Sequence, residues 1–202
     1  FIESLENKDC FNSQTPMQSD GKKIKFRPKN NSFSNSPYNV FLPETSLSFS
    51  PLQKLLNDKK FQSIISSYLN FRWKIYCCMT WYNPSTINSH YVHNLHRDND
   101  DYRVLGLYIY WNKVTKFNGS TVFVPKSHKL DIDDLENNKI FIESDKGTAF
   151  IADTCAWHGG NKVLKDHRYT TNIRFGKDNT YSSIVDGFVL APTSEQLKFL
   201  KP

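Results

Sequence analysis

The chain has 202 residues, enough for one domain with a sizeable buried core but short for two. Apolar residues make up 38% of the sequence and aromatic residues 14%, so large rings can fill a core and disorder along the whole chain is not expected. The net charge of +6 is scattered along the sequence. That distribution favours a solvated surface, although it permits an anionic partner, either a small molecule or nucleic acid.

The four cysteines do not form a pattern typical of a disulfide framework or a zinc clamp. Cys77 and Cys78 are adjacent, so they should point to opposite faces of a strand. The longest apolar runs are too short to cross a bilayer, and the sequence has no signal-peptide pattern. We therefore expect a cytoplasmic protein without a membrane span.

Residues 1–49 are polar and rich in Asn, Ser, Lys and Pro, which predicts an irregular extension packed on a single domain over residues 50–202. Ser50-Pro51 is a good helix start, because a capping residue precedes a proline in the first turn. Apolar residues then follow helical spacing up to Leu69, with a break near Asp58. The pattern fits one kinked helix or two short ones.

After Asn70 the period of the apolar residues changes to two, which predicts a strand. The residues expected on one face of it are Trp73, Ile75, Cys77, Met79 and Trp81. Asn118-Gly119 predicts a hairpin turn. Further strands are expected over 104–111, 120–124, 148–152, 168–175 and 184–190, the first of them central in a sheet. The order predicts a mainly β fold, a double-sheet jelly roll or barrel with N-terminal helical cover.

His96-Arg97-Asp98 is the first candidate for a metal site. Residues two apart on a strand point the same way, so the imidazole and the carboxylate can reach one metal. Such a triplet arises often by chance, and His158, just after the strand over 148–152, makes the motif more specific. Two imidazoles and one carboxylate leave three coordination sites of an iron open, although zinc accepts the same ligands.

Arg168 is the candidate that selects between these metals. It comes ten residues after His158, and its planar fork can hold the far carboxylate of 2-oxoglutarate through two parallel hydrogen bonds. Thr170, Asn172 and Arg174 share its strand face and form a polar stripe where a barrel is otherwise apolar. The alternative is that this face is a solvent-facing strand edge.

Taken together, these motifs resemble the phytanoyl-CoA dioxygenase-like family over roughly residues 71 to 176. The stretches that carry the resemblance are His96-Arg97-Asp98, residues 118–129 with Val-Pro-Lys-Ser-His, residues 147–160 with Asp-x-x-x-Trp-His-Gly-Gly, and Arg168. The resemblance implies a double-stranded β-helix (cupin-like) core, Fe(II), 2-oxoglutarate as cosubstrate, and O2. Lys126 departs from the pattern, because the family usually has glycine there, and this puts the local turn in doubt.

Carried over position by position, the resemblance makes His96, Asp98 and His158 the iron ligands and Arg168 the 2-oxoglutarate anchor. Tyr108 would line the cosubstrate pocket, and the stripe residues Thr170 and Arg174 would contribute to it. The implied reaction is hydroxylation of a small-molecule metabolite with release of succinate and CO2, and the net charge of +6 permits an anionic substrate. The family acts on many metabolites, so the resemblance names no substrate.

Two other functions fit parts of the sequence. The spacing from Arg168 to Arg174 resembles that of alkylated-base repair oxygenases, and the basic charge would suit a nucleic-acid demethylase with the same chemistry. Against it, the Pro-Lys-Ser-His turn is foreign to those enzymes. A non-catalytic β-barrel binding protein is the other alternative, with a zinc hydrolase as a weaker one because no general base accompanies the triad.

Overall fold

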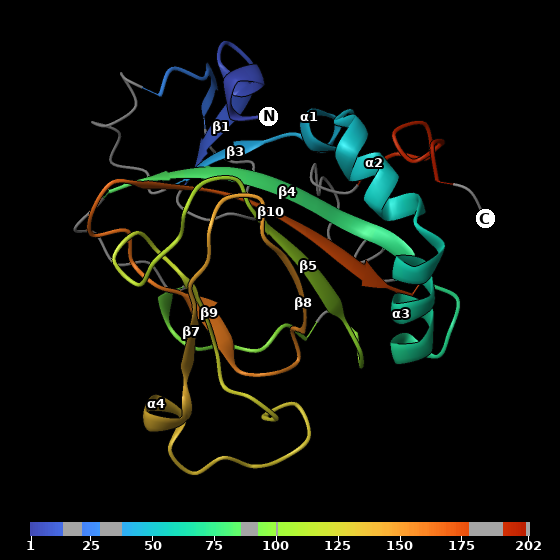
Figure 1. Ribbon diagram of the computed structural model, residues 1–202, viewed down its shortest axis with the longest axis vertical. Helices are drawn as coiled ribbons and strands as arrows, with labels where there is room; N and C mark the ends of the chain where they lie inside the picture. The colour runs from blue at the N-terminus through green and yellow to red at the C-terminus, as the bar shows by residue number, and fades with distance from the viewer. Residues whose placement is uncertain (14–21, 29–37, 86–92, 100, 178–191, 201–202) are drawn as a thin grey trace.

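The structure is a computed structural model that describes residues 1–13, 22–28, 38–85, 93–99, 101–177 and 192–200 (Figure 1). The strand expected over 184–190 lies outside the described residues. Within them, no helix is both long enough and apolar enough to cross a membrane.

Seven strands form the larger of two antiparallel sheets, in the order β2-β1-β3-β4-β10-β5-β8. Their bounds are β1 (Asp9–Ser13), β2 (Lys22–Lys25), β3 (Tyr38–Phe41), β4 (Lys74–Pro84), β5 (Leu105–Tyr110), β8 (Ala149–Asp153) and β10 (His167–Gly176). The strands predicted over 104–111, 148–152 and 168–175 match β5, β8 and β10 to within one residue at each end. Strand β5 lies between β10 and β8, so its predicted central place is confirmed.

The smaller sheet has three short strands in the order β7-β6-β9. They are β6 (Thr121–Phe123), β7 (Ile140–Ile142) and β9 (His158–Gly160), and only β6 was expected from the sequence. His96 pairs with His158 through an isolated bridge at the edge of β9. Figure 1 shows β7 and β9 on the far side of the molecule from the helices that lie between β3 and β4 in the chain. The arrangement is a two-sheet jelly roll.

Short helices cover the outer face of the larger sheet, as predicted. The chain forms α1 (Pro43–Leu47), α2 (Ser50–Asn57) and α3 (Lys59–Leu69), besides a 3-10 turn at Ile2–Leu5 and α4 (Leu135–Asn138). The break at Asp58 gives two helices because the backbone of Asp58 is extended, with φ −66° and ψ 124°. The Asp58 carboxylate caps the next helix by accepting a hydrogen bond of 2.8 Å from Phe61 N. Apolar side chains of α2 and α3 pack on residues of β4, β5 and β10, including Leu107 and Ile173.

A β-bulge breaks the alternation predicted for β4. The pairing of β10 with β4 shifts between Arg174, opposite Cys77, and Phe175, opposite Ile75, so that Tyr76 is the extra residue. Ile75 therefore packs in the outer core, whereas Cys77 packs in a separate cluster with Met79 and Trp81. The prediction that Trp73 and Ile75 share a face with those residues was wrong, because a bulge reverses the facing of the residues beyond it, and Trp73 packs against the outer core as Ile75 does.

The N-terminal segment is more regular than the sequence indicated. Strands β1, β2 and β3 extend the larger sheet beyond β4, and α1 follows directly. Phe26 and Phe41, which look isolated in the sequence, pack edge-on at a centroid distance of 5.0 Å in a cluster with Tyr82 and Tyr169. The expectation of an irregular segment was wrong for these residues, since widely spaced aromatics suffice when strand pairing brings them together. The division of the chain at residue 49 stays a prediction.

The Asn118-Gly119 turn is not a hairpin. The strands on either side of it, β5 and β6, lie in different sheets, so the turn carries the chain from one sheet to the other. Asn118 Oδ1 accepts hydrogen bonds from the backbone and side chain of Thr115, and Gly119 has a φ of 92°. The Asn-Gly motif predicted the position of the turn correctly but not which strands it connects. The hydrogen bonds of such a turn are local, so they carry no information on how the flanking strands pair.

Candidate metal and cosubstrate site

The three predicted metal ligands meet at the edge of the smaller sheet. His96 and His158 exchange two backbone hydrogen bonds of 2.8 Å, and Asp98 N donates to Thr154 O at 2.9 Å. One ligand atom from each of the three side chains lies within 4.8 Å of the others. The prediction that these residues converge is correct, although His96 forms only an isolated bridge and the pair does not lie on a regular strand.

Both imidazoles have the tautomer that a metal ligand needs. The Nδ1 atoms of His96 and His158 lie 3.0 and 2.9 Å from the carbonyl oxygens of Asn94 and Ala156. A carbonyl can only accept, so each Nδ1 carries the proton and each Nε2 presents a lone pair. Burial lowers the pKa of His158 to about 4, which keeps this ring neutral at neutral pH.

Asp98 is buried and carries a charge that other side chains compensate. Its Oδ2 lies 2.9 Å from Arg174 Nη2 and 3.6 Å from His158 Nε2. Burial by itself raises the pKa of this carboxyl, but Arg174 first, then the two histidines and Thr154, bring it below its ordinary value. Asp98 is therefore ionised at neutral pH, where His158 is neutral. Two imidazole nitrogens and one carboxylate oxygen fit a divalent transition metal, and the donors alone do not choose between iron and zinc.

Arg168 is a fully buried cation held by neutral groups. Its Nε and Nη2 donate to Asn83 Oδ1 at 3.1 and 3.0 Å, and its Nη1 donates to the Gly119 carbonyl. No carboxylate of the described residues forms an ion pair with it. A buried charge without a counter-charge is costly, so this guanidinium is placed to receive an anion.

Sequence reasoning missed the two groups that hold Arg168. Asn83 pairs with Arg168 across β4 and β10, and its inward position follows from the alternation that places Trp81 there. Gly119 is required by its surroundings, because an added Cβ would lie 2.7 Å from Val163 Cγ2 at a φ that side chains disfavour. The turn therefore brings a backbone carbonyl to the guanidinium.

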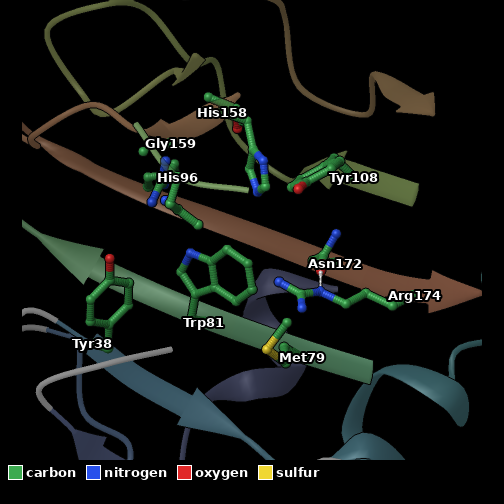
Figure 2. Close-up of a pocket in the computed structure, with 12 residues that line it drawn as sticks. Tyr38, Met79, Trp81, His96, Tyr108, His158, Gly159, Asn172 and Arg174 are labelled. Carbon is green, nitrogen blue, oxygen red and sulfur yellow. Dashed lines mark hydrogen bonds between the residues drawn. The ribbon is translucent and has the colours of Figure 1, made fainter. Parts of the chain in front are cut away.

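The polar stripe faces the interior and not solvent. Arg168, Asn172 and Arg174 line the same cavity as His96 and His158 (Figure 2). The alternative of a solvent-facing strand edge was wrong, because β10 lies between β4 and β5.

The remaining predicted residues take different places. Tyr108 lines the cavity and stacks on Phe150 at a centroid distance of 5.0 Å. Thr170 lies on the stripe and is fully buried, but it is not among the residues that line the cavity. Their roles toward a cosubstrate stay predictions.

Large side chains close the cavity on the side of β3 and β4. They are two aromatic residues, Tyr38 and Trp81, and Met79 between them and Arg174 (Figure 2). Trp81 is 8% exposed, and its indole N–H has no hydrogen-bond partner among the described residues. Trp81 thus leaves a buried donor beside the metal-ligand cluster, where an oxygen of a bound molecule can accept from it.

The turn at Lys126 forms in spite of the missing glycine. Lys126 adopts a left-handed φ of 66°, the conformation for which glycine is best suited. Lys129 N and Leu130 N donate back to the Lys126 carbonyl at 2.9 and 3.0 Å. The doubt raised by the departure from the family pattern is thereby resolved.

No protein-family model matches the sequence, and the search of curated proteins found no match. Solved structures do match. SnoN, a non-haem alpha-ketoglutarate-dependent epimerase from nogalamycin biosynthesis, superposes with a TM-score of 0.53 at 11% identity, over 79% of this chain and 74% of its own. HygX from Streptomyces hygroscopicus, whose structure holds nickel, 2-oxoglutarate and hygromycin B, has a TM-score of 0.54 at 13% identity, over 81% and 82%.

EctD from S. alaskensis, whose structure holds 2-oxoglutarate and 5-hydroxyectoine, has a TM-score of 0.58 at 14% identity, over 79% of this chain and 65% of EctD. Identities this low establish a common fold, and the fold agrees with the two sheets described above. The chain therefore has the double-stranded β-helix fold expected from its resemblance to the phytanoyl-CoA dioxygenase-like oxygenases.

Proposed function

We propose that the protein is an Fe(II)- and 2-oxoglutarate-dependent dioxygenase that hydroxylates a small-molecule metabolite. One observation carries the proposal: the two histidines of a two-histidine, one-carboxylate cluster line one cavity together with a buried arginine that has no carboxylate partner in the described residues. A metal alone would need only the first of these features. A dianion that chelates a metal at one end and presents a carboxylate at the other needs both.

His96, Asp98 and His158 would hold the metal, and Arg168 would receive the distal carboxylate of 2-oxoglutarate. The bound iron and 2-oxoglutarate supply the oxidising chemistry, with succinate and CO2 as products. Asn83 and Gly119 keep the guanidinium in place before the cosubstrate arrives, so less ordering is needed on binding. Tyr108 and Trp81 would exclude water from opposite sides of the cavity.

The structural neighbours support a small-molecule substrate. HygX and EctD were solved with hygromycin B and 5-hydroxyectoine, and SnoN acts in nogalamycin biosynthesis. SnoN is an epimerase, so the fold does not by itself choose hydroxylation as the outcome. The zinc-hydrolase alternative is weakened because the described lining residues include no glutamate that could act as general base.

The test is succinate formation from 2-oxoglutarate by anaerobically iron-loaded protein after O2 is admitted. We expect slow turnover without substrate that is lost in His96→Ala and in Arg168→Ala, and retained in Arg72→Ala, which removes an exposed arginine. A metabolite screen for faster succinate formation would then identify the substrate. Absence of turnover, together with absence of metal-dependent 2-oxoglutarate binding, would favour the non-catalytic β-barrel. Binding of nucleic acid that weakens steeply with salt would favour the demethylase.

A further inference from the structure

Ser127 contacts both segments that carry the metal ligands. Its hydroxyl accepts a hydrogen bond of 2.7 Å from Trp157 N, the residue before His158. Its carbonyl accepts from the guanidinium of Arg97, the residue between His96 and Asp98. Ser127 itself is 1% exposed and comes from the turn after β6, outside both segments.

The hydroxyl of Ser127 is used twice, and only a hydroxyl can serve both contacts. It donates to Val124 O at 2.7 Å while it accepts from Trp157 N. Val124 N in turn donates to Trp157 O at 2.8 Å, so two hydrogen bonds join the turn to the distal ligand segment. The left-handed Lys126 makes this path of the chain possible.

Arg97 connects the other ligand segment to the same place. Neighbouring residues in extended chain point in opposite directions, so Arg97 is directed away from its neighbours His96 and Asp98. Its guanidinium lies 5.1 Å from the centre of the Trp157 ring, besides donating to Ser127 O. Arg97 therefore contacts the turn and the distal ligand segment together, and its stacking adds a cation–π attraction.

The ligand segment 96–98 has few other restraints. It is not part of a strand, and its described backbone bonds are the bridge to His158 and the bond from Asp98 N to Thr154 O. These are three backbone hydrogen bonds, two between His96 and His158 and one from Asp98 N, and the Asp98 carboxylate is also paired with Arg174. The contacts of Arg97 with Ser127 and Trp157 add a restraint at the residue between the two ligands, on the opposite side of the segment.

We propose that Ser127, acting through Arg97 and Trp157, is a positioning residue that sets the geometry of the metal ligands. This inference rests on the proposed function only in taking the three residues to be metal ligands. Contacts that orient ligands in this indirect way commonly change metal affinity about 10–100-fold when removed. The consequence is that the turn after β6 contributes to metal binding without touching the metal.

The test measures Co(II) binding by calorimetry and by the visible absorption of bound Co(II), without 2-oxoglutarate and without turnover. We expect Ser127→Ala and Arg97→Met each to weaken Co(II) binding about 10-fold or more and to alter the absorption band. Ser127→Thr keeps the hydroxyl and should recover most of the affinity. The double variant should lose less than the sum of the two single losses, because both substitutions loosen the attachment of the ligand segments to the same turn.

Ser46→Ala is the matched control. Ser46 is also a fully buried serine whose hydroxyl is hydrogen-bonded, in this case to Thr80, away from the cavity lining. It should lower the melting temperature without changing Co(II) affinity or absorption. The inference is overturned if Ser127→Ala and Arg97→Met bind Co(II) like the wild type while only their melting temperatures fall. Failure of the wild type to form succinate, with these Co(II) effects present, would count against the proposed function alone.

Discussion

Arg168 and Arg174 lie on the same face of β10, six residues apart, but their guanidinium groups have partners of different charge. Arg174 reaches Asp98 at 2.9 Å, so its charge is paired with a carboxylate of the protein. Arg168 is held by an amide oxygen and a backbone carbonyl, which orient the guanidinium but do not neutralise it. One cation is therefore neutralised within the protein, whereas the other is held only by neutral groups, as the proposed binding of an external anion requires.

The largest effect is expected on protein stability, when Arg174, the arginine paired with Asp98, is substituted. Arg174→Met leaves the Asp98 carboxylate buried without its guanidinium, which should lower the free energy of unfolding of the metal-free protein by about 3 kcal/mol. Co(II) then supplies the missing positive charge, so the rise in melting temperature on adding Co(II) should be larger in the variant than in the wild type. Thermal unfolding with and without Co(II) measures both. An equal or smaller rise would mean that Arg174 does not compete with a metal for Asp98.

Arg168→Met should have the opposite profile, a loss of ligand binding with little change in metal binding. Removing a fork that holds a carboxylate should weaken 2-oxoglutarate binding to the Co(II) protein about 100-fold. Arg168→Lys should be intermediate, because an ammonium keeps the charge but not the two parallel hydrogen bonds. Anaerobic calorimetry measures these affinities. Wild-type affinity in Arg168→Met would place the anion site elsewhere.

Asn83→Asp tests the comparison most directly, because it gives Arg168 the kind of partner that Arg174 already has. The new carboxylate would lie where Asn83 Oδ1 now accepts two hydrogen bonds, and it would compete with 2-oxoglutarate for the guanidinium. We expect about 10-fold weaker 2-oxoglutarate binding and unchanged Co(II) binding. Asn83→Ser keeps a neutral acceptor and is the matched control. Equal 2-oxoglutarate affinity in the two variants would show that the charge of the partner of Arg168 does not control binding.

The smallest change in stability is expected for substitution of Trp81. Trp81→Phe removes an indole N–H that has no partner in the described residues, so the variant should unfold at the wild-type temperature or slightly above it. Tyr110→Phe offers the contrast, since the Tyr110 hydroxyl donates to Thr121 Oγ1 at 2.9 Å and accepts from Thr121 N at 3.0 Å. The free energy of unfolding of Tyr110→Phe should be lower than that of the wild type by about 1 kcal/mol. A larger loss in Trp81→Phe than in Tyr110→Phe would show that the indole N–H is satisfied.

The sequence predicted four of the seven strands of the larger sheet and the convergence of the three candidate metal ligands, for one physical reason. Long strands such as β10 carry enough alternating residues for the period to be read, and alternation places Arg168 and Arg174 on one inward face. The ligand motif needs only short-range spacing within His96-Arg97-Asp98, and His158 follows a recognisable strand. These features depend on local pattern.

The features that sequence reasoning missed depend on which segments pair. Strand β9 has three residues, His158–Gly160, too few to show a period and containing two glycines. The bulge at Tyr76 is visible only in the register with β10. The partners of Arg168, and the part played by Ser127, come from segments distant in the chain. No local pattern specifies these contacts.

The turn at Gly119 has a consequence for how the proposed anion site can change over evolutionary time. Arg168 is held there by a peptide carbonyl, which every amino acid carries, so this contact does not depend on the identity of a side chain. It does depend on the number of residues between β5 and β6, which sets where the carbonyl falls. Insertions and deletions in this loop should therefore be more damaging than most substitutions, with Gly119 itself the exception. Relatives that retain the arginine should keep the loop length.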